Sequence, residues 1–432
     1  MSQCPRVVYP DRSQTRFEVV CLDTQLPPDH LARVVWSLIM SLDLSEFYDR
    51  IKARDDVAGR PTSDPAVLLA LWLYATLDGI GAGRVVDRLC NYHAAYRWLC
   101  GGVPVNHSLL SEFRRESGTI LDRLLTQSLT SLIAEGLVTL EEVAIDGTKV
   151  RARAGRGSLA QANKLTKLEA AVAQRVATLK SELDDTVEAA ERRRQERALR
   201  AAQERQARLK RAQERLAELD QEKQERAKRH AKEEAEKSAP SVSTSDPEAR
   251  SMRMPDGSIH LAWNVQVATA HGFIVAIEPT DRRKDSGLAI ETVEQIERRC
   301  GTTPERLLAD ATAITQDEID QLSQRSPELL VYSPPPKERE TVTAETLRKR
   351  RWKHEREPDA VKQWRERMAS EAGKAVYRRR KLTEHAHAKM KNHGFGRMPV
   401  HGIARVRVVC LLYALAHNLR QALWLRAAAA AV

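Results

Sequence analysis

The segment from Ser158 to Lys237 constrains the fold more than any other part of the sequence. It contains no proline and almost no glycine or aromatic residue, and Ala, Glu, Arg, Lys, Leu and Gln dominate it. Apolar residues step by three and four from Leu165, become sparse through Glu191–Gln206 and return at Leu209. This spacing predicts a rod, or a hairpin that turns near the sparse stretch, with roughly 120 Å of helix in total. A solvated charged helix without a partner is the alternative interpretation.

Short apolar runs on either side of this segment predict β-strands. Val143–Ile145 ends in Asp146, and Arg306–Ala309 ends in Asp310, so each run should deliver a carboxylate to an edge of a sheet. The other predicted elements are strands at His260–Ala270, Phe273–Pro279 and Leu329–Tyr332, and helices at Ser286–Arg298 and Asp317–Gln324. Their order predicts an α/β protein with one mixed sheet.

The region before the first strand is predicted to be helical. The expected helices are His30–Leu42, Val67–Leu77, Gly83–Cys90, Leu109–Arg115 and Leu121–Glu135. Asp64 is suited to cap the second helix and Pro65 to its first turn, while Arg114 and Arg115 should be exposed. The cluster resembles a DNA-binding domain with a helix-turn-helix, although short, closely spaced helices occur in many unrelated proteins.

These changes in pattern divide the chain into four parts. They are a helical N-terminal domain (1–136), the first strand of a catalytic core (137–157), the inserted rod or hairpin (158–238), and the rest of the core with C-terminal helices that include Ile403–Leu423 (239–432).

The charge balance indicates a polyanionic partner. The chain has 70 Lys and Arg against 59 Asp and Glu, a formal net charge of +11, which favours nucleic acid over a merely solvated basic protein. Six scattered cysteines without a C-x-x-C pair argue against a zinc site or a disulfide framework, and for a reducing cytosol. We find neither a signal-peptide pattern nor an apolar run of about 18 residues, so a cytoplasmic protein that does not enter a membrane is expected.

A third carboxylate, Glu384, follows the last predicted strand and lies in a basic helix. Tyr377, Arg380, Glu384 and Lys391 are spaced by three, four and seven residues, which places all of them on one stripe of that helix. Converging carboxylates can hold two divalent ions about 4 Å apart, the arrangement used to break and remake phosphodiesters. A salt-bridged surface helix is the alternative interpretation of this charged run.

Several phrases of the sequence together resemble one family. The stripe fits Y-x2-R-x3-E-x6-K, residues 59–65 read Gly-Arg-Pro-Thr-Ser-Asp-Pro, and residues 145–149 read Ile-Asp-Gly-Thr-Lys. Further phrases are Asn-Val-Gln at 264–266, Arg-Glu-Arg-Met at 365–368 and Ala-His-Asn-Leu at 416–419. In this order, and over nearly the whole chain, the set is similar to the DDE-type bacterial insertion-sequence transposases.

The resemblance implies an RNase H-like catalytic core whose carboxylate triad binds Mg²⁺ or Mn²⁺. Asp146 and Glu384 match the family pattern directly. Asp310 is followed by Ala-Thr-Ala, where the family usually has a glycine and an aromatic residue nearby, so Asp285 is an alternative second carboxylate. The expected DNA-contacting residues are Tyr377, Arg380, Lys391, Lys149, Arg114 and Arg115.

The expected function is therefore cutting and joining of the ends of a mobile element. The partners would be double-stranded DNA, both terminal inverted repeats and target, and a second copy of the chain. A DNA-binding architectural protein or a nuclease that does not join strands are the alternatives. His385 and His387 are interpreted as structural or DNA-contacting rather than as metal ligands, and Trp263 as a core residue rather than a base-stacking one.

Overall fold

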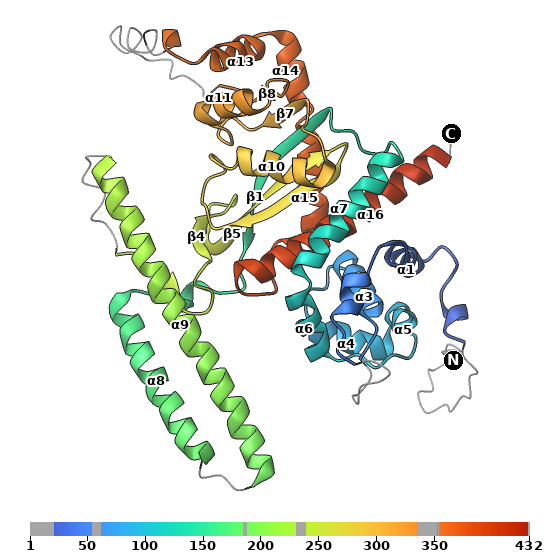
Figure 1. Ribbon diagram of the computed structural model, residues 1–432, viewed down its shortest axis with the longest axis vertical. Helices are drawn as coiled ribbons and strands as arrows, with labels where there is room; N and C mark the ends of the chain where they lie inside the picture. Colours follow the sequence, from blue (N-terminus) through green and yellow to red (C-terminus); the bar gives the residue numbers. More distant parts are fainter. Residues whose placement is uncertain are drawn as a thin grey trace, which may run out of the picture.

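The computed structural model describes residues 21–53, 62–184, 188–229, 239–335, 352 and 354–430. At its centre is a six-stranded sheet in the order β4-β5-β1-β7-β8, with β6 also paired to β5. The strands are β1 (Glu142–Arg151), β4 (Arg250–Arg253), β5 (Ile259–Ala270), β6 (Phe273–Thr280), β7 (Arg306–Ala309) and β8 (Leu330–Tyr332) (Figure 1). β5 is antiparallel to both β1 and β6, and β1, β7 and β8 are parallel. This mixed sheet confirms the predicted α/β class with an RNase H-like core.

The first strand is longer than the sequence predicts. We expected it to end at Asp146, but it continues to Arg151 and pairs with β5 along that length. Buried Thr148 and Val150 continue the inward-facing alternation, which keeps the strand in the sheet. The other neighbour of β1, strand β7, ends at Ala309, so Asp146 has no paired residue on that side of β1.

Seven N-terminal helices precede the sheet in the described part of the chain. They are α1 (Leu31–Ser41), α2 (Ser45–Asp49), α3 (Pro65–Leu77), α4 (Gly83–Tyr92), α5 (Ala94–Cys100), α6 (His107–Glu116) and α7 (Gly118–Ala134). Asp64 accepts a hydrogen bond from the Ala66 backbone N–H at 2.8 Å and Pro65 begins α3, as predicted. The short helices α2 and α5 were not predicted. Residues 59–61 of the predicted entry to α3 lie outside the described residues.

The last helix, α16 (Ile403–Ala430), joins these helices to the sheet. It packs against α3, α7 and β6, and buried residues of both regions form one continuous hydrophobic core. In the described part of the chain α16 is the one helix long and apolar enough to cross a membrane, but most of that stretch is buried inside the protein. Its apolar composition is therefore explained by its place in the core.

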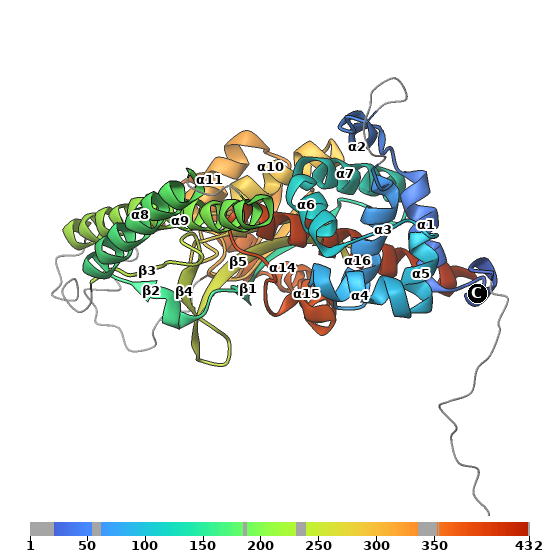
Figure 2. The same cartoon turned by 90° about the horizontal axis from the view of Figure 1, so that it is seen from below.

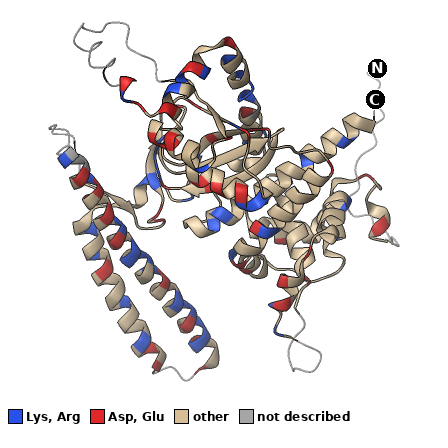
Figure 3. Cartoon of the chain, turned by 45° about the horizontal axis from the view of Figure 1, so that its top comes forward, with Lys and Arg blue, Asp and Glu red and all other residues tan. Residues whose placement is uncertain are grey.

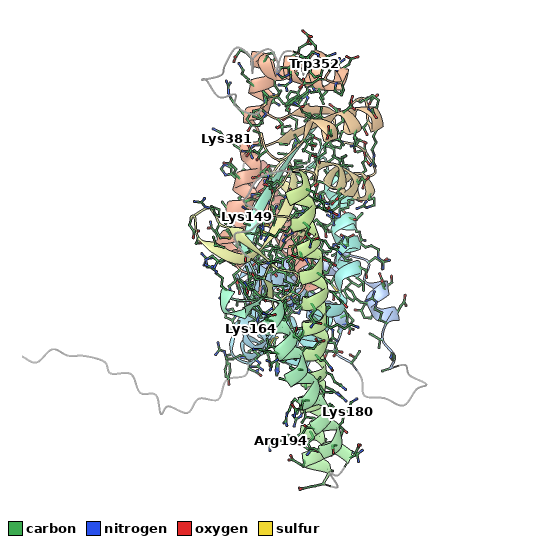
Figure 4. All side chains as sticks on the ribbon, turned by 90° about the vertical axis from the view of Figure 1, so that its left-hand side faces the viewer. Lys149, Lys164, Lys180, Arg194, Trp352 and Lys381 are labelled. Atoms are coloured by element: carbon green, nitrogen blue, oxygen red, sulfur yellow. The ribbon has the colours of Figure 1, made fainter. Side chains whose placement is uncertain are left out.

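The charged segment forms two packed helices, α8 (Ala162–Asp184) and α9 (Ala189–Arg229), which project from the body (Figure 1). The chain reverses between α8 and α9, so the turn precedes the sparse stretch Glu191–Gln206 rather than falling within it. Apolar residues of both helices form a core separate from the main one: Leu165, Val172, Val176, Leu209, Ala212 and Leu216. Ala160 and Val242, from two short strands at the base of the hairpin, complete it. Acidic and basic residues are interspersed along its surface (Figure 3). Arg194 lies near the far end of the hairpin (Figure 4).

The remaining helices flank the sheet. They are α10 (Ala289–Cys300), α11 (Gln316–Arg325), α13 (Asp359–Ala369), α14 (Glu371–Arg378) and α15 (Lys381–Met390), followed by a π-helical turn at Lys391–Phe395. We expected Tyr377 to Lys391 to lie on one helix, which is wrong. Hydrogen bonds from Arg379 N to Val376 O and from Arg380 N to Tyr377 O span three residues and tighten the chain between α14 and α15. The hairpin and the N-terminal helices lie at opposite ends of the molecule (Figure 2).

Candidate active site

Strand register brings Asp146 and Asp310 together. Val143, Ala144 and Ile145 are buried in β1, and Ile145 is the partner of Ala309 in the parallel pairing with β7. Asp146 and Asp310 are the residues that directly follow this last paired position in the two strands, so they lie side by side. Residues at paired positions point to the same face of a sheet. Both aspartates are half-buried.

Arg380 connects Glu384 to Asp146. Helix α15 packs against β1 and β5, and Arg380 immediately precedes it. Arg380 Nη1 lies 3.6 Å from Asp146 Oδ2, and Arg380 Nη2 donates a hydrogen bond to Glu384 Oε1 at 3.2 Å. Tyr377 Oη lies 3.5 Å from Asp310 Oδ1. Arg380 thus contacts Asp146 and Glu384, and the neighbouring Tyr377 contacts Asp310.

The alternative carboxylate, Asp285, is on the other face of β1. Asp285 Oδ1 accepts hydrogen bonds from Asn264 Nδ2 and Gln266 Nε2 at 2.7 and 2.8 Å. Gln266 pairs with Gly147, one residue along from Asp146, and successive residues of a strand face opposite ways. The register therefore favours Asp310 over Asp285 as the neighbour of Asp146. Nothing in the sequence pattern indicated that Asp285 would contact Gly147.

Burial and neighbouring carboxylates disfavour the ionised form of Asp146. Burial raises the pKa of the Asp146 carboxyl to about 6; Arg380 opposes the rise, and Asp285 and Asp310 add to it. His387, whose Nδ1 is 3.6 Å from Asp146 Oδ2, is buried, and this burial lowers its pKa to about 4. His387 is therefore neutral at pH 7, and Arg380 is the cation nearest Asp146.

The donor set suits a hard divalent cation. Asp146, Asp310 and Glu384 offer carboxylate oxygens, the ligands that Mg²⁺ and Mn²⁺ prefer. A cation would stabilise the ionised form of Asp146, which burial and the neighbouring carboxylates disfavour. No three His, Cys, Asp or Glu side chains are already arranged as a metal site within the part of the chain that the structure describes. Instead Arg380 lies between Asp146 and Glu384.

The other candidate residues have varied surroundings. Lys149 Nζ donates to Arg253 O at 3.0 Å, Lys391 is exposed at the end of α15, and Arg115 forms ion pairs with Glu112 and Glu116. We expected Arg114 to be exposed, but its guanidinium lies 4.0 Å from the centre of the Trp72 ring and is largely buried. DNA contact by these residues stays a prediction.

The structure also shows where Trp263, His385 and His387 lie. Trp263 is completely buried in β5, which agrees with the core interpretation. His385 is exposed, whereas His387 is buried beside Asp146. Three arginines that line two cavities described below were not predicted, because they belong to no motif and come together only in the fold. They are Arg153, Arg397 and Arg405.

Fold and site together define an RNase H-like protein of the DDE class. Residues 337–423 match the family model of the transposase DDE domain, and residues 20–116 match that of a transposase domain. The chain is thus a DDE-type insertion-sequence transposase by family. The first match includes Glu384, whereas Asp146 and Asp310 lie outside both matches. Comparisons with curated proteins and with solved structures give no match.

Proposed function

We propose that the protein cuts the ends of a mobile DNA element and joins them to target DNA, with Asp146, Asp310 and Glu384 as ligands of two divalent ions. The observation that carries the proposal is the adjacency of Asp146 and Asp310 beneath α15, which carries Glu384. Divalent ions bound there would activate the attacking oxygen and stabilise the leaving oxygen.

The residues around the triad have supporting roles in this proposal. Arg380 balances the carboxylates in the free protein, and its planar set of N–H donors also suits a phosphate of the strand to be cut. Tyr377 orients Asp310 through its hydroxyl group. Lys391, the residue that follows α15, would contact the same strand. The N-terminal helices would recognise the terminal inverted repeats, and two copies of the chain would hold the two ends together.

Cleavage of end-containing DNA in Mg²⁺ or Mn²⁺ tests this proposal. Asp146→Asn, Asp310→Asn and Glu384→Gln should each reduce cleavage by at least about a hundredfold, since each removes a charged ligand. Asp285→Asn is the matched control and should retain most of the activity. Loss of activity in Asp285→Asn but not in Asp310→Asn would assign the second position to Asp285. Cleavage without transfer of the 3′ end would identify a nuclease, and DNA binding without cleavage an architectural protein.

A further inference from the structure

Two cavities adjoin where the N-terminal helices meet the end of β1. Their volumes are about 430 and 440 Å³, and both are lined by Arg114, Arg153 and Pro399. Arg397 lines the first cavity and Arg405 the second. A fifth arginine, Arg115, also lines the second cavity but is paired with Glu112 and Glu116. We call the two adjoining cavities, with the other four arginines, the arginine groove.

The guanidinium groups of the groove lack acidic partners. Arg114 donates to Gly81 O at 2.7 Å, Arg153 to Pro399 O at 2.6 Å and Arg397 to Arg153 O at 3.2 Å, all of them neutral carbonyl groups. Among the described residues Arg405 has no hydrogen-bond or ion-pair partner. The one carboxylate that lines either cavity, Glu112, pairs with Arg115.

Like charges in the groove repel one another. Burial, together with the nearby charges of Arg153 and Arg405, lowers the pKa of Arg114 to about 10. Arg114 is held in place by Trp72 and by the Gly81 carbonyl, so it cannot turn away from its neighbours. Because an arginine stays charged at neutral pH, an anion in the groove would relieve this repulsion.

The groove is joined rigidly to the candidate active site. Arg151 N–H donates to Gly396 O at 3.1 Å, and Met398 N–H donates to Arg151 O at 2.8 Å, so the segment that carries Arg397 is fixed to the end of β1. From Asp146 to Arg153 the extended chain covers about 23 Å at about 3.3 Å per residue. Along the axis of a DNA duplex this length corresponds to about seven nucleotides of one strand at about 3.4 Å each.

We propose that the arginine groove binds a backbone phosphate of duplex DNA, about seven nucleotides from the strand position held at Asp146. This inference rests on the proposed function, because that function places DNA at Asp146. Several guanidinium groups without acidic partners suit a phosphodiester, and Ser108 and Ser111 on α6 add hydroxyl donors to the same wall. The contact fixes the position of the duplex without reading its sequence.

Binding of a fluorescein-labelled duplex of about 30 base pairs to the full chain, followed by anisotropy without divalent ions, tests the proposal. Arg153→Gln with Arg405→Gln should weaken binding on the order of tenfold and reduce the salt slope of log K by about 2. Both side chains are exposed, so these changes leave the core intact. Arg325→Gln with Lys362→Gln, which removes the same charge from α11 and α13, is the matched control and should change neither value. Equal effects of the two pairs would overturn the proposal.

Two further comparisons separate the possible outcomes. Asp146→Asn and Glu384→Gln should keep the wild-type salt slope even though the proposed function requires them for cleavage. If the wild-type protein does not cleave end-containing DNA, the proposed function is refuted, whereas the binding measurement on the groove is unaffected. The duplex should also raise the melting temperature more than inorganic phosphate does at equal ionic strength. Equal rises would identify a site for free phosphate and overturn the assignment to DNA.

Discussion

Asp285 lies directly over Gly147, on the face of β1 opposite Asp146. A Cβ atom at residue 147 would overlap Asp285 Oδ1 and would lie 2.6 Å from Gln266 Nε2. Because Asp285 Oδ1 also accepts hydrogen bonds from Gln266 and Asn264, it is not free to move aside. The glycine of the Ile-Asp-Gly-Thr-Lys phrase therefore makes room for a carboxylate that is bound by two side-chain amides.

We predict that Gly147→Ala lowers the free energy of unfolding by about 1–3 kcal/mol, the usual cost of overpacking. Urea denaturation measures this change. Asp285→Ala removes the overlapping atoms, so Gly147→Ala should cost less in that background, as a double-mutant cycle would show. The same cost in both backgrounds would contradict the steric explanation.

The sequence was sufficient to predict the features that depend on local pattern. Asp64 and Pro65 indicated the start of α3, and apolar runs ending in Asp146 and Asp310 indicated two strands that present carboxylates. A parallel pairing of those strands brings the carboxylates together, and the structure has that pairing. The apolar steps from Leu165 onward likewise predicted packed helices, because period and composition are local properties.

Features that depend on tertiary contacts were not predictable. The four arginines of the groove come from residues 114, 153, 397 and 405, and only the docking of α6 and α16 beside β1 unites them. The tightened turn between α14 and α15 depends on two backbone hydrogen bonds that no residue type indicates. The choice between Asp310 and Asp285 likewise required the strand register, since Asp310 ends a predicted strand but lacks the glycine usual in the family, and Asp285 precedes a predicted helix.

The ionisation of Asp146 should make stability depend on pH. Burial raises its pKa to about 6, whereas an unfolded aspartate has a pKa of about 3.9. The native state therefore binds more protons between these values, and the free energy of unfolding falls as pH rises through that range. Asp146→Asn lacks this penalty. We predict that it is more stable than wild type by about 1–3 kcal/mol at pH 8, and about equally stable near pH 4.

Urea titrations at several pH values measure this difference. Glu384→Gln provides the comparison, because the Glu384 side chain is 59% exposed and its neutralisation should change stability little at any pH. A gain in Asp146→Asn that is the same at pH 4 and pH 8 would show that the carboxylate is not destabilised by its surroundings.

A buried guanidinium group joins α10 to α7. The Arg299 side chain is 3% exposed, forms an ion pair with Asp122 and donates to Val275 O at 3.3 Å. Asp122→Ala leaves this charge without its carboxylate, and we predict a loss of about 2–4 kcal/mol in the free energy of unfolding. Arg299→Met removes the charge and keeps most of the volume, so it should cost under about 1.5 kcal/mol. If Arg299→Met proves the more costly change in urea denaturation, the pair itself stabilises the fold.

The α8–α9 hairpin should open without unfolding the rest of the protein. Its apolar core, which includes Leu209 and Ala212, is separate from the main core, and ion pairs such as Arg250 with Glu222 at 3.1 Å connect its base to the sheet. Leu209→Ala should destabilise the hairpin by about 2–4 kcal/mol, the cost of a cavity at a fully buried leucine. Tryptic cleavage at Arg193 and Arg194 should then be faster, while the main melting transition stays within about 1 °C of wild type because local opening draws on the hairpin alone. Ala201→Ser, at an exposed position of the same helix, should change neither rate nor transition. A fall of the main transition by several degrees in Leu209→Ala would mean that hairpin and sheet unfold as one cooperative unit.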